Sequence, residues 1–147
     1  MTRHVARPGT GNVPLLLNEI RHALTRLRDE GAPTTLDLTG IPMMPEDTHA
    51  FDASLGQGEV RAVVDAGGES EVQETGFAGV WRITHRNADG AVLARHIEVT
   101  HVPDILKSQP VDIAAGLERL AVRLAADLAP DLVADLTEDL DRPEEVS

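Results

Sequence analysis

Apolar residues recur along the chain with two different periods, and these periods predict where helices and strands lie. Residues 14–30 and 111–128 both carry apolar residues three or four positions apart, which is typical of amphipathic helices. Pro45–Leu55 begins with a proline and two acids and stops before Gly56, which predicts a short helix. We expect Pro130 to interrupt the second long helix. The apolar positions of the two long helices are Leu16, Ile20, Ala23, Leu24 and Leu27, and Ile113, Leu117, Leu120, Leu124 and Leu128.

Between the long helices the period changes to two, which predicts strands. Turn residues separate these strands, and Asn87–Gly90 reads as the turn of a β-hairpin whose second strand ends near His101–Pro103. Strands that cluster together and are flanked by helices predict an α+β fold. We expect an antiparallel sheet of about four to five strands, with two long helices and one short helix packed on it. The strand segments are 35–39, 58–65, 69–75, 80–85 and 91–100.

Composition limits how much structure the chain can build. Its 147 residues are 41% apolar but only 2% aromatic, so one core of aliphatic side chains is expected. We predict a flexible arm over residues 1–13 and a single α+β domain over 14–129. Residues 130–147 are predicted to form an acidic tail that is partly helical or disordered.

The formal net charge is −12, and residues 127–147 carry −7 of it. A surface this acidic argues against a nucleic-acid partner. The absence of cysteine excludes disulfides and cysteine-ligated metal clusters within the chain. Neither a leader peptide nor a long apolar run is visible, so we expect a cytoplasmic protein without a membrane span.

The histidines are the residues with the clearest metal-binding chemistry, but their spacing does not match a metal site. His22, His49, His85, His96 and His101 show none of the short spacings of zinc ligands. Strand alternation puts His85 near the hairpin turn and His96 farther away, so a shared site would need an unusual register. We predict no bound metal and no cofactor, and keep delivery of a metal or binding of a small ligand by histidines as an alternative.

No pattern of catalytic residues stands out. The sequence has neither a Gly-x-Ser-x-Gly elbow nor a Gly-Lys-Ser/Thr phosphate loop, so we predict that the protein is not an enzyme.

Trp81 reads first as a core residue and second as a contact for a partner. With Phe77 and Val80 beside Gly76 and Gly79, it can form an apolar edge.

Five blocks of sequence resemble the C-terminal domain of the HupH family of hydrogenase expression and formation proteins, which also includes HyaF and HoxQ. They occur in family order between about residues 14 and 112, which makes the set more specific than any single motif. Longer members of the family have a large region before this domain. The blocks are residues 17–24 (LNEIRHAL), 35–38 (TLDL), 55–60 (LGQGEV), 74–81 (ETGFAGVW) and 101–109 (HVPDILKSQ).

The resemblance implies an accessory protein, or chaperone, in the maturation of a nickel–iron uptake hydrogenase. Its expected partners are the precursor of the iron–sulfur small subunit and other hydrogenase accessory proteins. The resemblance transfers no catalytic residues, and the sequence leaves homodimer formation open. We expect the partner to contact the hairpin region and the neighbouring glycine turns, at Phe77, Gly79, Trp81, His101, Pro103 and Gln109.

Overall fold

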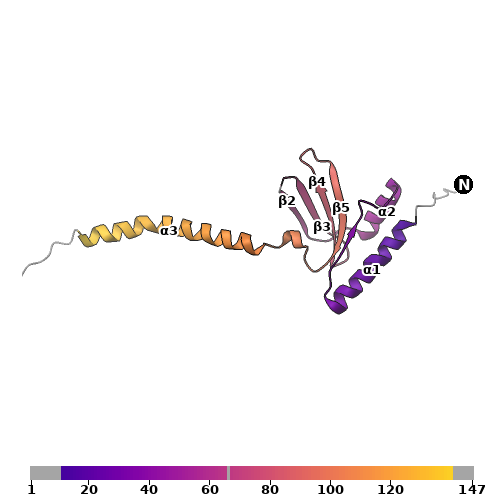
Figure 1. The fold of residues 1–147 in the computed structure, drawn as a ribbon, viewed down its shortest axis with the longest axis horizontal. Coiled ribbons are helices and arrows are strands. Elements are labelled where there is room, and N and C mark those ends of the chain that lie inside the picture. Colours follow the sequence, from indigo (N-terminus) through magenta and orange to yellow (C-terminus); the bar gives the residue numbers. More distant parts are fainter. Residues whose placement is uncertain (1–10, 66, 141–147) are drawn as a thin grey trace, which may run out of the picture. The chain divides into compact units, whose positions relative to one another are not determined.

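The computed structural model describes residues 11–65 and 67–140, and the burial of side chains as far as residue 128. Within these residues the chain forms three α-helices, five strands and one short 3-10 helix (Figure 1). The contacts divide the chain after Asp104 into two compact units, each described by itself. The elements are α1 (Asn12–Glu30), β1 (Thr34–Asp37), α2 (Pro45–Leu55), β2 (Arg61–Asp65), β3 (Glu69–Glu74), β4 (Val80–Arg86), β5 (Val92–Val99), η1 (Asp104–Leu106) and α3 (Pro110–Leu140).

The five strands form one antiparallel sheet in the order β1-β5-β4-β3-β2. Strands β2 to β5 follow one another through short turns, so their pairing is local. β1 instead pairs with β5, which places Leu36 opposite Ile97. The α+β class and the antiparallel sheet predicted from the sequence are therefore confirmed.

Helices α1 and α2 lie on the same side of the sheet (Figure 1). The core between them and the sheet is aliphatic apart from Phe51, as the composition predicts. Burial of this apolar surface is the main favourable term in folding, at about 25 cal/mol for each Å² removed from water. The buried core residues are Leu16, Ile20, Ala23, Leu27, Leu38, Phe51, Leu55, Val80, Ile97 and Val99.

Side chains on the opposite face of the sheet alternate with the core residues. Trp81 and Ile83 follow Val80 and Arg82 in this alternation, and Val72 lies opposite Ile83 in the register. All three are buried, and none belongs to the core beneath the helices. The indole N–H of Trp81 donates a hydrogen bond of 3.1 Å to the carbonyl oxygen of Thr100, which satisfies its one polar group.

Asp52 links α2 to the two central strands. Its carboxylate accepts hydrogen bonds of 2.9 and 3.1 Å from Arg95 on β5. Arg82 Nε on β4 lies 3.2 Å from the same carboxylate, a contact with the distance of an ion pair but not the angle of a hydrogen bond. One acidic side chain thus sets the position of α2 over two strands.

The second unit contains α3, which runs from Pro110 to Leu140. The prediction that Pro130 interrupts the helix is wrong: α3 continues through that residue. A proline removes one N–H group and strains one turn, and the alanines at 125, 126 and 129 favour helix on its N-terminal side. Residues 1–10 and 141–147 lie outside the described residues, and the predicted domain boundaries stay a prediction.

Candidate functional site

Two of the six predicted contact residues lie in the tight turn between β3 and β4. Phe77 is 50% exposed at the tip of this turn. Gly79 has φ of +85°, and a Cβ there would lie 3.3 Å from a methyl group of Leu27 on α1. A larger residue would be strained by both effects, so glycine is needed to bring the turn against the helix.

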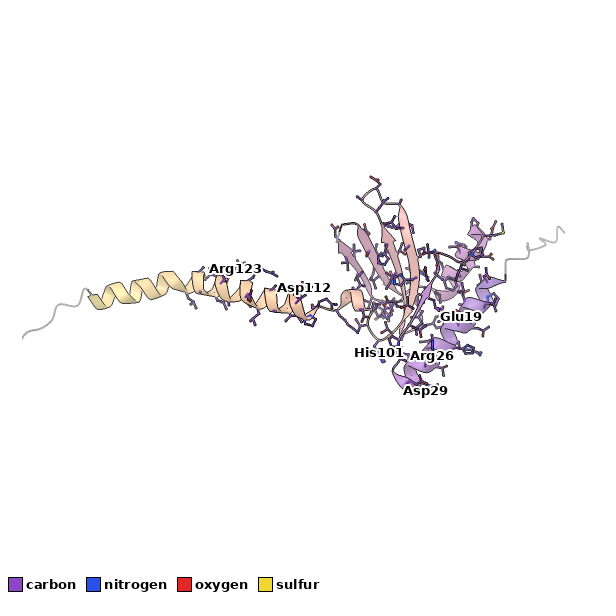
Figure 2. The ribbon with its side chains drawn as sticks, viewed as in Figure 1. Glu19, Arg26, Asp29, His101, Asp112 and Arg123 are labelled. Atoms are coloured by element: carbon purple, nitrogen blue, oxygen red, sulfur yellow. The ribbon has the colours of Figure 1, made fainter. Side chains whose placement is uncertain are left out.

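The other four predicted residues differ from one another in exposure. Trp81 and Pro103 are buried, whereas His101 and Gln109 are exposed. His101 follows the end of β5 (Figure 2), and Gln109 belongs to the second unit. The structure does not place Gln109 relative to the other five, and a contact between these residues and a partner stays a prediction.

A groove of about 350 Å³ lies where the turn carrying Phe77 meets α1 and the end of α2. Its lining is apolar except for one arginine and one serine, which is common in sites that bind an apolar partner. Sequence reasoning identified only Phe77 from this set. The lining residues are Leu17, Ile20, Arg21, Leu24, Ser54, Leu55 and Phe77.

Hydrogen bonds at the groove are made within the protein itself. The N–H of Gly76 donates to the carbonyl oxygen of Leu55 at 2.7 Å, which ties the turn to the end of α2. The N–H of Phe77 donates to Thr75 Oγ1, and its carbonyl oxygen accepts from the N–H of Val80. Ser54 Oγ donates to the carbonyl oxygen of Ala50. These polar groups are therefore already paired.

Arg21 is the one charged residue in the lining, and it is exposed. Among the described residues, its side chain makes no hydrogen bond or ion pair that competes for a partner's charge. Figure 2 labels other charged residues of the same helix: Glu19, Arg26 and Asp29. Arg26 bonds Thr34, and Asp29 bonds Arg28. The sequence signal for Arg21 was its place beside Leu17 and Leu24 on one stripe of α1, one position from the buried Ile20.

His85 and His96 lie together on the sheet face opposite the helices. Their ring centroids are 5.3 Å apart, so the expectation that a shared site would need an unusual register is wrong. His96 pairs with Ile83, which makes it a diagonal neighbour of His85 in an ordinary antiparallel ladder. Ser70 Oγ lies 2.7 Å from His85 Nδ1, and Glu98 lies 3.2 Å from His96 Nε2. In the described part of the chain, no group of three or more histidine, aspartate or glutamate residues is arranged to hold a metal ion.

Two carboxylates of the sheet have lowered pKa values. Hydrogen bonds from the backbone and side chain of Thr39 lower the pKa of Asp37, and the neighbouring His96 contributes in the same direction. A hydrogen bond from Arg61 lowers the pKa of Glu71, with a smaller contribution from the charge of Arg61. Both shifts favour the ionised carboxylates. Neither group is a candidate acid or base for catalysis near neutral pH.

The family model described as "HupH hydrogenase expression protein, C-terminal conserved region" matches residues 10–126. The chain therefore belongs to this family.

No helix among the described residues is both long and apolar enough to span a membrane.

Individual relatives agree with the family. HoxQ of Cupriavidus necator, a hydrogenase expression/formation protein, is 27% identical over 112 residues, which are 76% of this chain and 40% of that protein. HupH of Rhizobium leguminosarum is 35% identical over 91 residues, 60% of this chain and 32% of that protein. The chain thus spans 40% or less of the length of these two curated relatives.

A solved structure shares the fold. The hydrogenase expression protein HupH from Thiobacillus denitrificans superposes with a TM-score of 0.77 at 42% identity. The match covers 81% of this chain and 99% of the solved chain. The fold described above is thus also that of a family member of similar extent.

Proposed function

We propose that this protein is a non-enzymatic accessory factor in the maturation of a nickel–iron hydrogenase. In this role it binds an immature hydrogenase subunit, the precursor of the iron–sulfur small subunit, in the cytoplasm. The proposal is supported by the names of the relatives, which are hydrogenase expression and formation proteins. The single structural observation that carries it is the exposed Phe77 beside an apolar groove, a feature suited to holding another protein.

The predicted contact residues divide into two roles in this proposal. Phe77, His101 and Gln109 each present an exposed side chain that is expected to contact the partner. Gly79 lets the turn approach α1, and the buried Trp81 and Pro103 belong to the folded framework of this region. Exposed aromatic side chains are frequent anchors in protein interfaces, so Phe77 is expected to contribute most.

Capture of the precursor tests the proposal. The tagged chain is co-expressed with the small-subunit and large-subunit precursors, and the bound proteins are identified by mass spectrometry. We expect the small-subunit precursor to be recovered, and Phe77→Asp to reduce its recovery at least about tenfold, the loss of about 1.4 kcal/mol of binding free energy. Recovery of only the large subunit, or of neither, would refute the proposed partner.

Val63→Asp is the matched control for Phe77→Asp. Val63 is 52% exposed on the edge strand β2 and does not line the groove. The two substitutions introduce the same charge at similarly exposed apolar positions. An equal loss of binding in both variants would mean that added negative charge, rather than the groove, is responsible.

The pairing of His85 with His96 supports a second candidate function, binding of a metal ion for delivery. Two imidazole groups on one sheet face can share a metal ion such as nickel if the partner or water supplies further ligands. Glu98 and Ser70 already bond these rings, which lowers their availability. This function is therefore secondary to protein binding.

Calorimetric titration with nickel and with zinc separates the two functions. Binding at micromolar metal that is lost in both His85→Ala and His96→Ala would favour delivery of a metal. His22→Ala is the control, because His22 lies exposed on α1, away from the sheet. No heat at micromolar concentrations of either metal would eliminate this candidate.

A further inference from the structure

The groove beside Phe77 has properties that select one kind of occupant. It is formed by Leu17, Ile20 and Leu24 on α1, by Leu55 on α2 and by the exposed ring of Phe77. Residues 17 to 24 span two turns of α1, or about 10.5 Å at 1.5 Å per residue. An occupant that lies along α1 therefore has room for about two turns of apolar side chains.

The pairing of the groove's polar groups argues against an extended peptide. A strand bound in this place would bring unpaired N–H and C=O groups to a wall whose own backbone groups are already bonded. Each polar group buried without a partner costs about 1–3 kcal/mol. A helix carries its backbone hydrogen bonds with it and offers only side chains to the wall. The groove is thus suited to the apolar face of a helix.

The charge at the groove indicates which kind of residue should lie beside the apolar face of that helix. Arg21 is the one charged lining residue, and no acidic residue lines the groove beside it. An acidic side chain next to the apolar face would pair with Arg21, whereas a basic one would be repelled. At an exposed position the pair adds modest affinity and mainly determines which partner is accepted.

We propose that the groove binds an amphipathic helix of a client protein, with large aliphatic residues three and four positions apart and an acidic residue that pairs with Arg21. This inference rests on the proposed function in that the client is taken to be the immature hydrogenase subunit. It goes further by naming the groove and the chemistry of the bound segment. It also excludes binding by strand addition at this place.

Three synthetic peptides of about 14 residues test the inference, since two turns and their flanks need that length. The first is an alanine-based helix with leucines three and four residues apart and glutamates beside them. The second has lysines in place of the glutamates. The third has the composition of the first, but its leucines alternate as in a strand. Binding of each fluorescein-labelled peptide to the full chain is measured by fluorescence anisotropy.

We expect the glutamate helix to bind at least about threefold more tightly than the lysine helix, and at least about tenfold more tightly than the peptide with alternating leucines. Phe77→Asp should abolish this binding, and Val63→Asp should leave it unchanged. The decisive variant is Arg21→Glu, which should reverse the preference so that the lysine helix binds more tightly than the glutamate helix. Arg21 is exposed, so this substitution does not threaten folding, and the fluorescence of the buried Trp81 verifies that each variant is folded.

Equal affinity for all three peptides, or binding that Phe77→Asp does not affect, would overturn the inference. So would an unchanged charge preference in Arg21→Glu. Capture of the hydrogenase precursor gives an independent result. If the peptides behave as expected and the precursor is not captured, the groove stands and the proposed client is wrong. If the precursor is captured equally by the wild type and Phe77→Asp and no peptide binds, the proposed client stands and the binding role of the groove is wrong.

Discussion

Helices α1 and α3 have the same apolar period but different surroundings. In α1 four of the five repeated positions are buried, and Ile20 is only 4% exposed. In α3, with the second unit described by itself, the corresponding positions are exposed, and Leu117 is 68% exposed. Figure 2 labels Asp112 and Arg123, two of the charged residues of α3.

The difference shows that an apolar stripe in the sequence predicts which face of a helix can be buried. It does not predict which other part of the protein covers that face. The stripe of α1 gains its free energy from contact with α2 and the sheet, because stabilisation follows the apolar area removed from water. The stripe of α3 gains no such free energy while it is exposed. Substitutions in the two helices should therefore have very different effects on the free energy of unfolding.

The largest effect is expected for Ile20→Ala in α1. Loss of this buried side chain leaves a cavity in the core and should lower the free energy of unfolding by about 2–5 kcal/mol. Urea denaturation followed by the fluorescence of Trp81, the only tryptophan, measures the change. Leu15→Ala in the same helix is the control, because Leu15 is 63% exposed and should lose little. Similar losses in both variants would contradict the assigned face of α1.

A smaller effect is expected where a polar group ties a helix to the sheet. Asp52→Asn removes the negative charge that Arg82 and Arg95 share, and should cost about 1–2 kcal/mol. The estimate is kept low because Asp52 is partly exposed to solvent. Asp89→Asn, in the exposed turn of the hairpin, provides the comparison in the same urea experiment. Equal effects of the two substitutions would show that Asp52 does not fix α2 on the sheet.

Glu71 and Arg61 form an ion pair that is more exposed than the one of Asp52 with Arg82 and Arg95. Its contribution to the free energy of unfolding should depend on pH. Arg61 lowers the pKa of Glu71 in the folded protein below its usual value of 4.5. The pair therefore stabilises the fold above the pKa of the unfolded chain, and this stabilisation is lost as the pH falls through the lower folded pKa.

Urea midpoints of the wild type and Glu71→Gln, measured between neutral pH and about pH 3, test this dependence. The wild type should be slightly more stable at neutral pH, and the difference should disappear in acid. The effect should be smaller than that of Asp52→Asn, since the pair is open to solvent. A difference that grows as the pH falls would contradict the sign.

The smallest effect is expected for Leu120→Ala in α3. Leu120 is 56% exposed, and alanine favours helix at least as well as leucine, so the free energy of unfolding should change by less than about 0.5 kcal/mol. Denaturation is followed by Trp81 fluorescence and by circular dichroism. A loss of about 2 kcal/mol or more would show that the apolar stripe of α3 is covered in solution.

Local signals were sufficient to place most of the helices and strands. The proline and acids at its start, with Gly56 after its end, located α2 at Pro45–Leu55, as observed. Alternation and turn residues located β2 to β5 within a few residues. The pairing of β1 with β5 was not predicted, because strands about 60 residues apart in sequence leave no local mark of their register. The continuation of the helix through Pro130 was not predicted, because proline is unfavourable inside a helix by itself, whereas the alanines before it favour helix.

The groove was missed for a similar reason. Phe77 stood out as an aromatic residue between glycines, but Leu17 and Leu24 read as ordinary members of the α1 stripe. The bond between Gly76 and Leu55, together with the approach that Gly79 permits, brings three distant segments to one place. The proximity of His85 and His96 likewise depends on the hairpin register rather than on their spacing in sequence.

The sequence by itself determined the kind and limits of nearly every element, the α+β class and the family, because these depend on local periodicity and on ordered blocks of residues. Only the tertiary structure decided that the stripe of α1 is buried against α2 and the sheet, which face of the sheet each side chain occupies and that Arg21 lies at an apolar groove. These features depend on contacts between segments far apart in the chain, and their free energy exists only once those segments meet.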